Sequence, residues 1–195
     1  MNALLVLAHP ATDSLTQSLA RTVAQVISDC GHSCEIADLA AESFDPRYDL
    51  ADRALHHGKA QASEAVRAEQ ARIDRADVLV IVYPVYWWSM PGLLKGWIDR
   101  VFTNGWAYED QPGGVGLVKR LGRLPVHLLA IAGADEPTFE QRGFRKAMAT
   151  QIETGIFDYC GAPLVQSEIV FGSETRDVAD HFDVARAFGR QVVAT

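Results

Sequence analysis

The sequence predicts an α/β protein in which five parallel strands form one sheet between two layers of helices. Two observations favour this fold class. The chain contains short, β-branched apolar runs, which are typical of strands buried on both faces rather than of strands with one face in water. Amphipathic helical patterns separate these runs, and strands that alternate with helices pair in parallel.

The most informative stretch spans residues 77–102. Its apolar run from Val78 to Tyr83 ends at Pro84, which predicts a strand buried on both faces. Ser89-Met90-Pro91 then opens a helix, because a proline in the first turn loses no hydrogen bond. Apolar side chains at helical spacing continue this helix as one stripe: Leu94, Trp97, Ile98, Val101 and Phe102.

A second buried strand is predicted at the start of the chain, from Ala3 to Ala8. It has neither the basic region nor the cleavage pattern of a signal peptide. Ser14 and Gln17 fit a capping box that begins a helix, which extends to about Asp29 before Gly31 ends it. The first unit is therefore a strand, a short polar loop and a helix.

The polar loop of this unit has two interpretations. It lacks the glycine fingerprints of dinucleotide and phosphate-loop sites. A helix N-terminus flanked by the hydroxyls of Thr12, Ser14 and Thr16 can nevertheless hold a monophosphate, and His9 adds a donor or a charge. Alternatively, Ser14 only caps its own helix and His9 only ends the strand.

The loop after the central strand carries three aromatic rings, Tyr86, Trp87 and Trp88. The carboxyl end of a parallel strand is where open α/β sheets bind ligands, and flat rings suit a flat ligand. Alternatively, these rings cover the core. The position in a surface loop favours a binding role.

The remaining elements follow from local patterns. Ser33 to Ala37 predicts a short strand, residues 38–58 are polar and irregular, and Lys59 to Ala76 is rich in helix formers. Asn104 to Leu124 predicts a long loop containing Pro112, Gly113, Gly114 and Trp106. The last four segments are a strand, a helix, a strand and a helix: Leu124–Ala132, Phe139–Tyr159, Leu164–Phe171 and Arg176–Val193.

Parallel sheets of this kind have two common strand orders, and the missing dinucleotide glycines favour 2-1-3-4-5, the flavodoxin-like order. In that order the His9–Thr16 loop and the Pro84–Trp88 loop flank one crevice. A third loop at Gly133 and Ala134 lies on its other side, where a glycine permits a ligand to approach the backbone. A phosphate-binding loop beside a surface that can bind a flat ring predicts FMN.

Composition excludes several other classes of protein. The net charge of −7 argues against a nucleic-acid binder, and no apolar run is long enough to cross a bilayer. The three cysteines match no zinc spacing, and His56-His57 has no acidic partner at ligand spacing, so no metal site is predicted. We expect one domain over residues 1–195, reduced cysteines and a cytoplasmic location.

Two blocks of sequence connect the chain to a known family. In the first, Ala8-His9-Pro10 ends a strand and Ser14-Leu15-Thr16 opens a helix. The second reads YPVYWWSMP (83–91), LKGWIDRVF (94–102) and GWAY (105–108). With these blocks the chain resembles the flavodoxin-like NAD(P)H:quinone oxidoreductases, which include ancillary subunits of bacterial glutathione-gated potassium efflux systems.

The resemblance implies roles for individual residues. Eleven residues would bind the flavin: His9, Ser14, Leu15, Thr16, Pro84, Val85, Tyr86, Trp87, Trp88, Gly133 and Ala134. Trp88, Tyr108 and Phe139 would contact the substrate, with Tyr108 reaching across a two-fold homodimer to the neighbour's flavin. The helix that carries Trp97 and Phe102 would supply part of the dimer contact. Phe139 stands where larger members have a tyrosine, and the histidine that follows there is not found here.

The implied activity is two-electron reduction of quinones by NAD(P)H through bound FMN, in a ping-pong sequence without a catalytic side chain. FAD is the second choice, because the chain lacks the C-terminal region associated with it. The alternative is a flavin-binding regulatory subunit that docks on a membrane transporter. A one-electron carrier is disfavoured by the long aromatic loops, and a nicotinamide-only dehydrogenase by the missing glycines.

Overall fold

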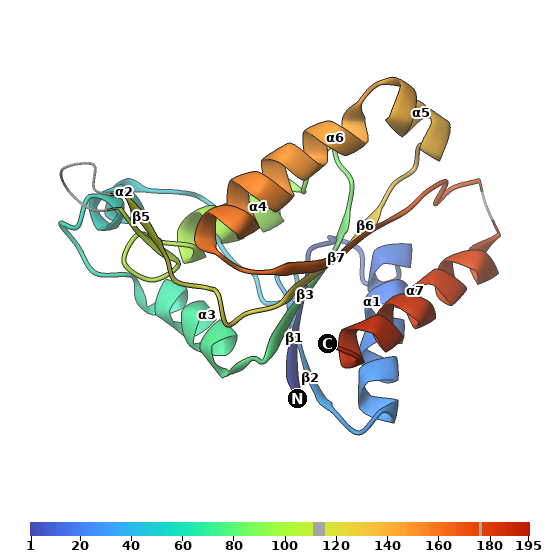
Figure 1. The fold of residues 1–195 in the computed structure, drawn as a ribbon, viewed down its shortest axis with the longest axis horizontal. Helices are drawn as coiled ribbons and strands as arrows, with labels where there is room; N and C mark the ends of the chain where they lie inside the picture. Colours follow the sequence, from blue (N-terminus) through green and yellow to red (C-terminus); the bar gives the residue numbers. More distant parts are fainter. Residues whose placement is uncertain (111–115, 176) are drawn as a thin grey trace.

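The computed structural model describes residues 1–110, 116–175 and 177–195 (Figure 1). Its main sheet has five parallel strands in the order β2-β1-β3-β6-β7. Their bounds are Asn2–Leu7 (β1), Ser33–Asp38 (β2), Val78–Pro84 (β3), Val126–Ile131 (β6) and Leu164–Val170 (β7). Numbered within this sheet, the order is 2-1-3-4-5, and the prediction is confirmed.

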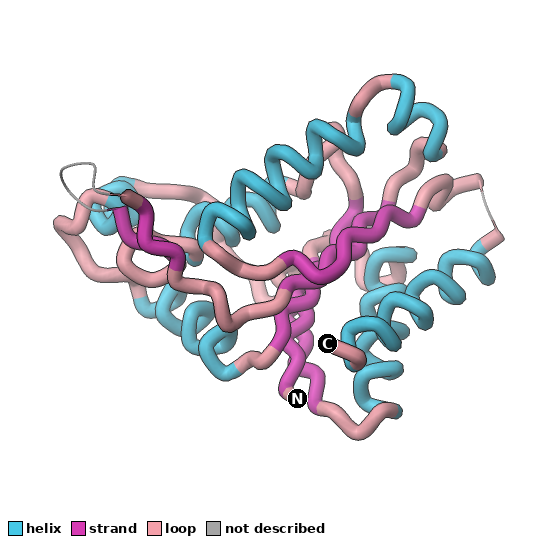
Figure 2. The backbone as a smooth tube through the Cα atoms, in the orientation of Figure 1, coloured by secondary structure: helices cyan, strands magenta, loops and turns pink. Residues whose placement is uncertain are grey.

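Helices cover both faces of the sheet, which gives three layers (Figures 1 and 2). On one face lie α1 (Leu15–Asp29) and α7 (Val178–Val193), which pack on each other and on the sheet. On the other face lie α3 (Glu64–Arg75), α4 (Gly92–Val101), α6 (Phe144–Met148) and a π-helix, η1 (Ala149–Asp158). Each face has its own hydrophobic core, since alternate strand residues point to opposite sides.

The central strand β3 is buried along its whole length, as its continuous apolar run predicts. β1 and β6 flank it in register, with Leu7 opposite Val82 and Pro84 opposite Ile131. The loops that follow these three strands therefore leave the sheet at the same edge. On β6, His127 is fully buried between Gln166 and Thr195, and burial lowers its pKa.

The polar segment 38–58 contains a helix that the sequence analysis missed. α2 (Leu50–His56) begins with a capping box in which Asp49 accepts from Asp52 N–H and the Asp52 carboxylate accepts from Asp49 N–H. The Arg100 guanidinium donates to the buried Asp52 carboxylate at 2.8 Å. The prediction of irregular structure was wrong because this helix is fixed by a contact distant in sequence. The next helix, α3, also starts later than predicted, at a Ser63 N-cap.

Two other segments differ from prediction. The expected loop from 104 to 124 contains a two-stranded antiparallel sheet of β4 (Tyr108–Asp110) and β5 (Leu117–Lys119); Pro112, Gly113 and Gly114 lie outside the described residues. The single helix predicted from 139 to 159 is three pieces, α5 (Glu136–Gln141), α6 and η1. Gly143 separates α5 from α6 with a φ of +71°, a conformation that favours glycine.

The N-cap of α1 differs from the prediction in one respect, and the aromatic rings of α4 are buried. Ser14 caps α1 by accepting from Gln17 N–H, but the Gln17 side chain donates to Asp38 on β2 instead of completing a capping box. The rings of Trp97 and Phe102 are buried in their own core, where Trp97 Nε1 donates to Glu69 at 2.8 Å. Their burial does not bear on the exposed face of α4, and the contribution of this helix to a dimer contact stays a prediction. The last helix begins at Val178, and its predicted first residue, Arg176, lies outside the described residues.

All three cysteines are free, as expected. Burial raises the pKa of both the Cys34 and the Cys160 thiol to about 11, so neither is a reactive thiolate at neutral pH. In the described part of the chain, no helix has the length and apolar character needed to span a bilayer.

Candidate active site

Three loops meet above the sheet, one after each of β1, β3 and β6. They correspond to the predicted His9–Thr16, Pro84–Trp88 and Gly133–Ala134 segments, and the parallel register places all three at the carboxyl edge. This is where open α/β sheets bind ligands.

The first loop presents unpaired backbone donors at the start of α1. Ser14 Oγ accepts from Gln17 N–H at 3.2 Å, which leaves the N–H groups of Leu15 and Thr16 with no acceptor among the described residues. Nδ1 of His9 lies 3.0 Å from Ala11 N and 3.2 Å from Ala11 O, so the ring is held by its own loop and Nε2 has no partner among the described residues. The free N–H groups and the helix dipole create an environment that attracts an anion.

The second loop is a tight two-residue turn. Tyr86 and Ser89 exchange two backbone hydrogen bonds of 3.0 and 3.1 Å, and Trp87 and Trp88 occupy the two central positions. Their φ angles are +49° and +59°, a left-handed conformation that costs a non-glycine residue about 1–2 kcal/mol. Two bulky residues in this conformation constitute stored backbone strain, which in proteins clusters at functional sites.

The two tryptophans have opposite environments. Trp87 is 93% exposed, whereas the Trp88 ring stacks on Phe144 with 3.7 Å between centroids and meets the edge of Phe139 at 5.5 Å. Ser89 Oγ, next in the chain, donates to the Gln151 side chain at 2.5 Å. The turn is thus held against α6 and η1 on one side, while Trp87 projects into solvent.

A cavity of about 230 Å³ lies between the second and third loops. Seven residues line it: Val85, Trp87, Trp88, Ala132, Gly133, Ala134 and Phe139. A Cβ atom added to Gly133 would meet Glu174 Oε1 at 3.9 Å and Ser173 Oγ at 4.0 Å, both ordinary van der Waals distances, so the protein does not crowd this position. Apart from the tryptophan indole nitrogens these side chains are hydrocarbon, which suits an uncharged flat ring.

The structure brings together most, but not all, of the predicted site residues. Val85, Trp87, Trp88, Gly133, Ala134 and Phe139 share this cavity, and the first loop lies at the same edge of the sheet. Tyr108 does not line it. Its ring packs against Tyr159 at 5.2 Å beside a different cavity, with its hydroxyl 3.4 Å from His56 Nδ1. Burial raises the pKa of the Tyr108 hydroxyl.

Sequence reasoning missed two residues that support the site, Phe144 and Gln151. Both lie on the α6–η1 segment, and both contact the aromatic turn at a separation of more than fifty residues. The sequence carries one weak signal, the break at Gly143, which shows that Phe144 begins a new helix. The partner of that helix is decided by tertiary packing.

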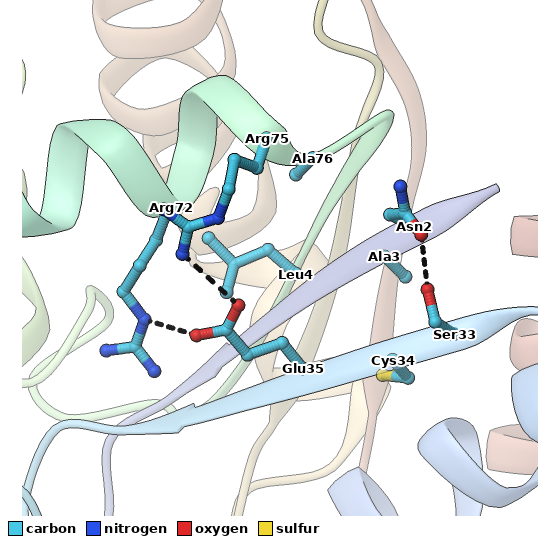
Figure 3. Close-up of a pocket in the computed structure, with 9 residues that line it drawn as sticks. All are labelled: Asn2, Ala3, Leu4, Ser33, Cys34, Glu35, Arg72, Arg75 and Ala76. Carbon is cyan, nitrogen blue, oxygen red and sulfur yellow. Dashed lines mark hydrogen bonds and ion pairs between the residues drawn. The ribbon is translucent and has the colours of Figure 1, made fainter.

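A larger cavity, of about 370 Å³, lies at the opposite edge of the sheet, beside the amino ends of β1 and β2 (Figure 3). Both arginines that line this cavity are already paired with carboxylates. Arg72 contacts Glu35 at 2.7 Å and also pairs with Glu42 and Glu69, while Arg75 lies 3.8 Å from Glu35. The cavity at the carboxyl edge, with its open glycine and strained aromatic turn, is therefore the better candidate for the active site.

Comparison with known proteins agrees with this geometry. The family model described as "Flavodoxin-like fold" matches residues 1–191. An uncharacterized NAD(P)H oxidoreductase from Haemophilus influenzae is 29% identical over 177 residues, covering 87% of this chain and 83% of the relative. The structure of the NAD(P)H:quinone oxidoreductase from Methanothermobacter marburgensis superposes with a TM-score of 0.91 at 27% identity, covering 98% of each chain.

A second solved structure has a ligand in its description. General stress protein 14 from Treponema denticola, in complex with FMN, has a TM-score of 0.65 at 25% identity and covers 100% of this chain and 97% of its own. The match over residues 1–191, the sheet order and these relatives lead to one conclusion: the chain belongs to the flavodoxin-like family and is an oxidoreductase.

Proposed function

We propose that this enzyme binds FMN at the carboxyl edge of the sheet and uses it to transfer two electrons from NAD(P)H to a quinone. The observation that carries the proposal is the convergence of three loops: free N–H donors at α1, a strained aromatic turn after β3, and an open glycine after β6. The names of the relatives support the NAD(P)H and quinone substrates, and the Treponema complex supports FMN. FAD is the second candidate.

The residues present fit a flavin mononucleotide. The Leu15 and Thr16 N–H groups, with the hydroxyls of Ser14 and Thr16 and Nε2 of His9, would hold its phosphate and the adjoining chain. Pro84 to Trp88 would lie along one side of its ring system, and the Gly133–Ala134 backbone would lie along the other. Gly133 fits this role because the protein atoms nearest to a Cβ built there lie only at ordinary van der Waals distance.

Bound flavin supplies hydride acceptance and donation, which no side chain can perform. The chain's part is to bind, orient and exclude water. Trp88, fixed by its stack on Phe144, and Phe139 form an apolar wall against which a flat nicotinamide or quinone can pack. Backbone N–H groups at Gly133 and Ala134 would stabilise negative charge at the ring edge. None of the seven lining residues has an acid–base side chain, so protons would come from water.

We also propose that the enzyme works as a homodimer in the cytoplasm, with Tyr108 completing the site of the partner subunit. Tyr108 does not line the cavity of its own subunit and sits on the separate β4–β5 sheet, which lies at the far left of Figure 1. A contact between Tyr108 and a flavin therefore requires a second copy of the chain. Activity measured on mixed dimers of a Trp88→Ala chain and a Tyr108→Ala chain would test this.

The absorption spectrum of the purified protein tests the central proposal. We expect a flavin spectrum, release of FMN on denaturation, and loss of the yellow colour on anaerobic addition of NADH or NADPH. A colourless protein that binds neither FMN nor FAD would refute the cofactor proposal. A flavoprotein that neither nicotinamide reduces would refute the reaction. Nothing in the described residues or in the comparisons supports docking on a transporter, and we do not propose it.

A further inference from the structure

A separate cavity of about 200 Å³ lies between the sheet and the helical segment formed by α6 and η1. In Figure 1 this segment, drawn in orange, lies over β6 and β7. Three neighbouring strands supply the floor of the cavity, with Tyr83, Ala130 and Ile169, and the helical segment supplies its roof, with Met148, Ile152 and Glu153. It shares no lining residue with the cavity proposed to hold the flavin ring.

The register of the strands explains the hollow in the floor. Tyr83 on β3 lies opposite Ala130 on β6, and Ala130 lies opposite Ile169 on β7. Paired residues of neighbouring strands point to the same face, so the three side chains stand in one row. Because the middle side chain is only a methyl group, space remains between the two larger ones. The roof continues into a π-helix, a rare conformation that frequently marks functional sites.

The floor presents a buried hydroxyl without a partner. Tyr83 is only 2% exposed, and no described residue hydrogen-bonds its hydroxyl. In the described part of the chain, His181 Nε2 is the one unpaired buried side-chain atom that has no accessible surface. The unpaired Tyr83 hydroxyl therefore keeps some accessible surface, and the cavity that Tyr83 lines is where a ligand would reach it. Buried hydroxyls in proteins are nearly always hydrogen-bonded, so this one favours a ligand that supplies the bond.

The charges at the cavity exclude an anion. Glu153 has neither an ion-pair nor a hydrogen-bond partner among the described residues, and it is half-buried. Burial and the charge of Glu153 raise the pKa of the Tyr83 hydroxyl, which stays protonated at neutral pH. The guanidinium of Arg145, which also lines the cavity, is already paired with Glu136 at 3.0 Å and with Glu140. An anion would meet the Glu153 carboxylate with no free cation to offset it.

The remaining surface selects an uncharged ring that carries a hydroxyl. A cation would have to leave water for a floor that is largely hydrocarbon, which is costly. A hydroxyl accepts one hydrogen bond and donates another, and so matches a phenol donor beside a carboxylate acceptor. The Met148 thioether makes favourable contacts with aromatic rings, and a cavity of about 150 Å³ is enough for benzene. We propose that this cavity binds a small single-ring phenol, whose hydroxyl accepts from the Tyr83 hydroxyl and donates to the Glu153 carboxylate.

Methyl NMR of the purified protein, with any cofactor that it carries, tests the proposal. The chain has three methionines, and Met148 lines the cavity. On titration with phenol its methyl signal, assigned by its loss in Met148→Leu, should shift and saturate. Tyr83→Phe and Glu153→Ala should each weaken the affinity for phenol roughly 2- to 10-fold, since each removes one hydrogen bond. Tyr159→Phe is the matched control, because it removes the same hydroxyl from a tyrosine that is exposed outside this cavity.

Toluene separates recognition of the hydroxyl from burial of the ring. It has the same ring without the hydroxyl, so Tyr83→Phe should not weaken its binding. The proposal is overturned if the Met148 signal does not saturate with phenol, if Tyr83→Phe binds phenol as tightly as Tyr159→Phe, or if toluene loses as much affinity as phenol in Tyr83→Phe. A saturating shift of Met90 alone would place phenol beside the aromatic turn and would also overturn it. Glu153→Ala provides the same comparison if Tyr83→Phe does not fold.

Discussion

Replacing Gly133 by alanine separates the role of this glycine in the fold from its proposed role in binding the cofactor. The added Cβ would have only two protein atoms within 4 Å, Glu174 Oε1 at 3.9 Å and Ser173 Oγ at 4.0 Å, both ordinary van der Waals distances. The φ angle of Gly133 is not in the left-handed region, so alanine fits the backbone without strain. The protein itself has room for the methyl group.

The expected magnitudes follow from these contacts. A glycine-to-alanine change that the backbone tolerates stabilises a protein by about 0.4–1 kcal/mol, because it restricts the unfolded chain. If the flavin ring lies against Gly133, the same methyl group overpacks the complex by about 1–3 kcal/mol. We therefore expect Gly133→Ala to fold slightly more stably without cofactor and to bind FMN roughly 5- to 150-fold more weakly.

Urea unfolding of the cofactor-free protein measures the first effect, and quenching of FMN fluorescence measures the second. Gly122→Ala is the matched control. Its added Cβ would meet only the Gly161 carbonyl oxygen, at 3.8 Å, and Gly122 does not line the candidate site. It should leave the affinity for FMN unchanged. If Gly133→Ala binds FMN as tightly as this control does, our placement of the ring against the third loop is wrong.

Three further predictions concern the scaffold. Burial lowers the pKa of His127, so the unfolded state binds more protons than the folded state at acid pH. The free energy of unfolding should therefore fall as the pH drops below about 6.5. In urea titrations, His127→Gln should flatten this pH dependence. Gly96→Ala should destabilise the protein by about 1–3 kcal/mol in the same assay, because its Cβ would lie 2.5 Å from Pro46 Cβ. An unchanged urea midpoint would contradict the close approach of α4 to the segment that contains Pro46. Trp88→Ala and Phe144→Ala should both lower the thermal midpoint, because each removes the stack between the two rings, but Trp88→Ala should weaken the affinity for FMN more, because only Trp88 lines the site.

Most of the fold could be predicted because its strands and helices are encoded locally. The run from Val78 to Tyr83 is apolar at every position, and only a strand covered on both faces buries all of it. Segments without such a pattern were predicted poorly. α2 is polar and short, and the buried pairing of Asp52 with Arg100 that anchors it joins residues nearly fifty positions apart.

The candidate site shows the same division. Strand order follows from the alternation of elements and the missing glycine fingerprints, so the three loops could be placed together in advance. The contacts that support the aromatic turn could not be predicted from the sequence. The left-handed turn at Trp87 and Trp88 is unfavourable for these residues locally, and it persists because Phe144 and Gln151 hold it from a distant helix.

By itself, the sequence determined the layered sheet, its strand order and the edge at which the candidate site lies, because hydrophobic periodicity and turn chemistry act over a few residues. Only the tertiary structure decided that the indole of Trp97 is buried in the core and that Tyr108 lines a different cavity from Trp88. These features depend on contacts between residues far apart in the chain, and no local pattern records which distant side chains will meet.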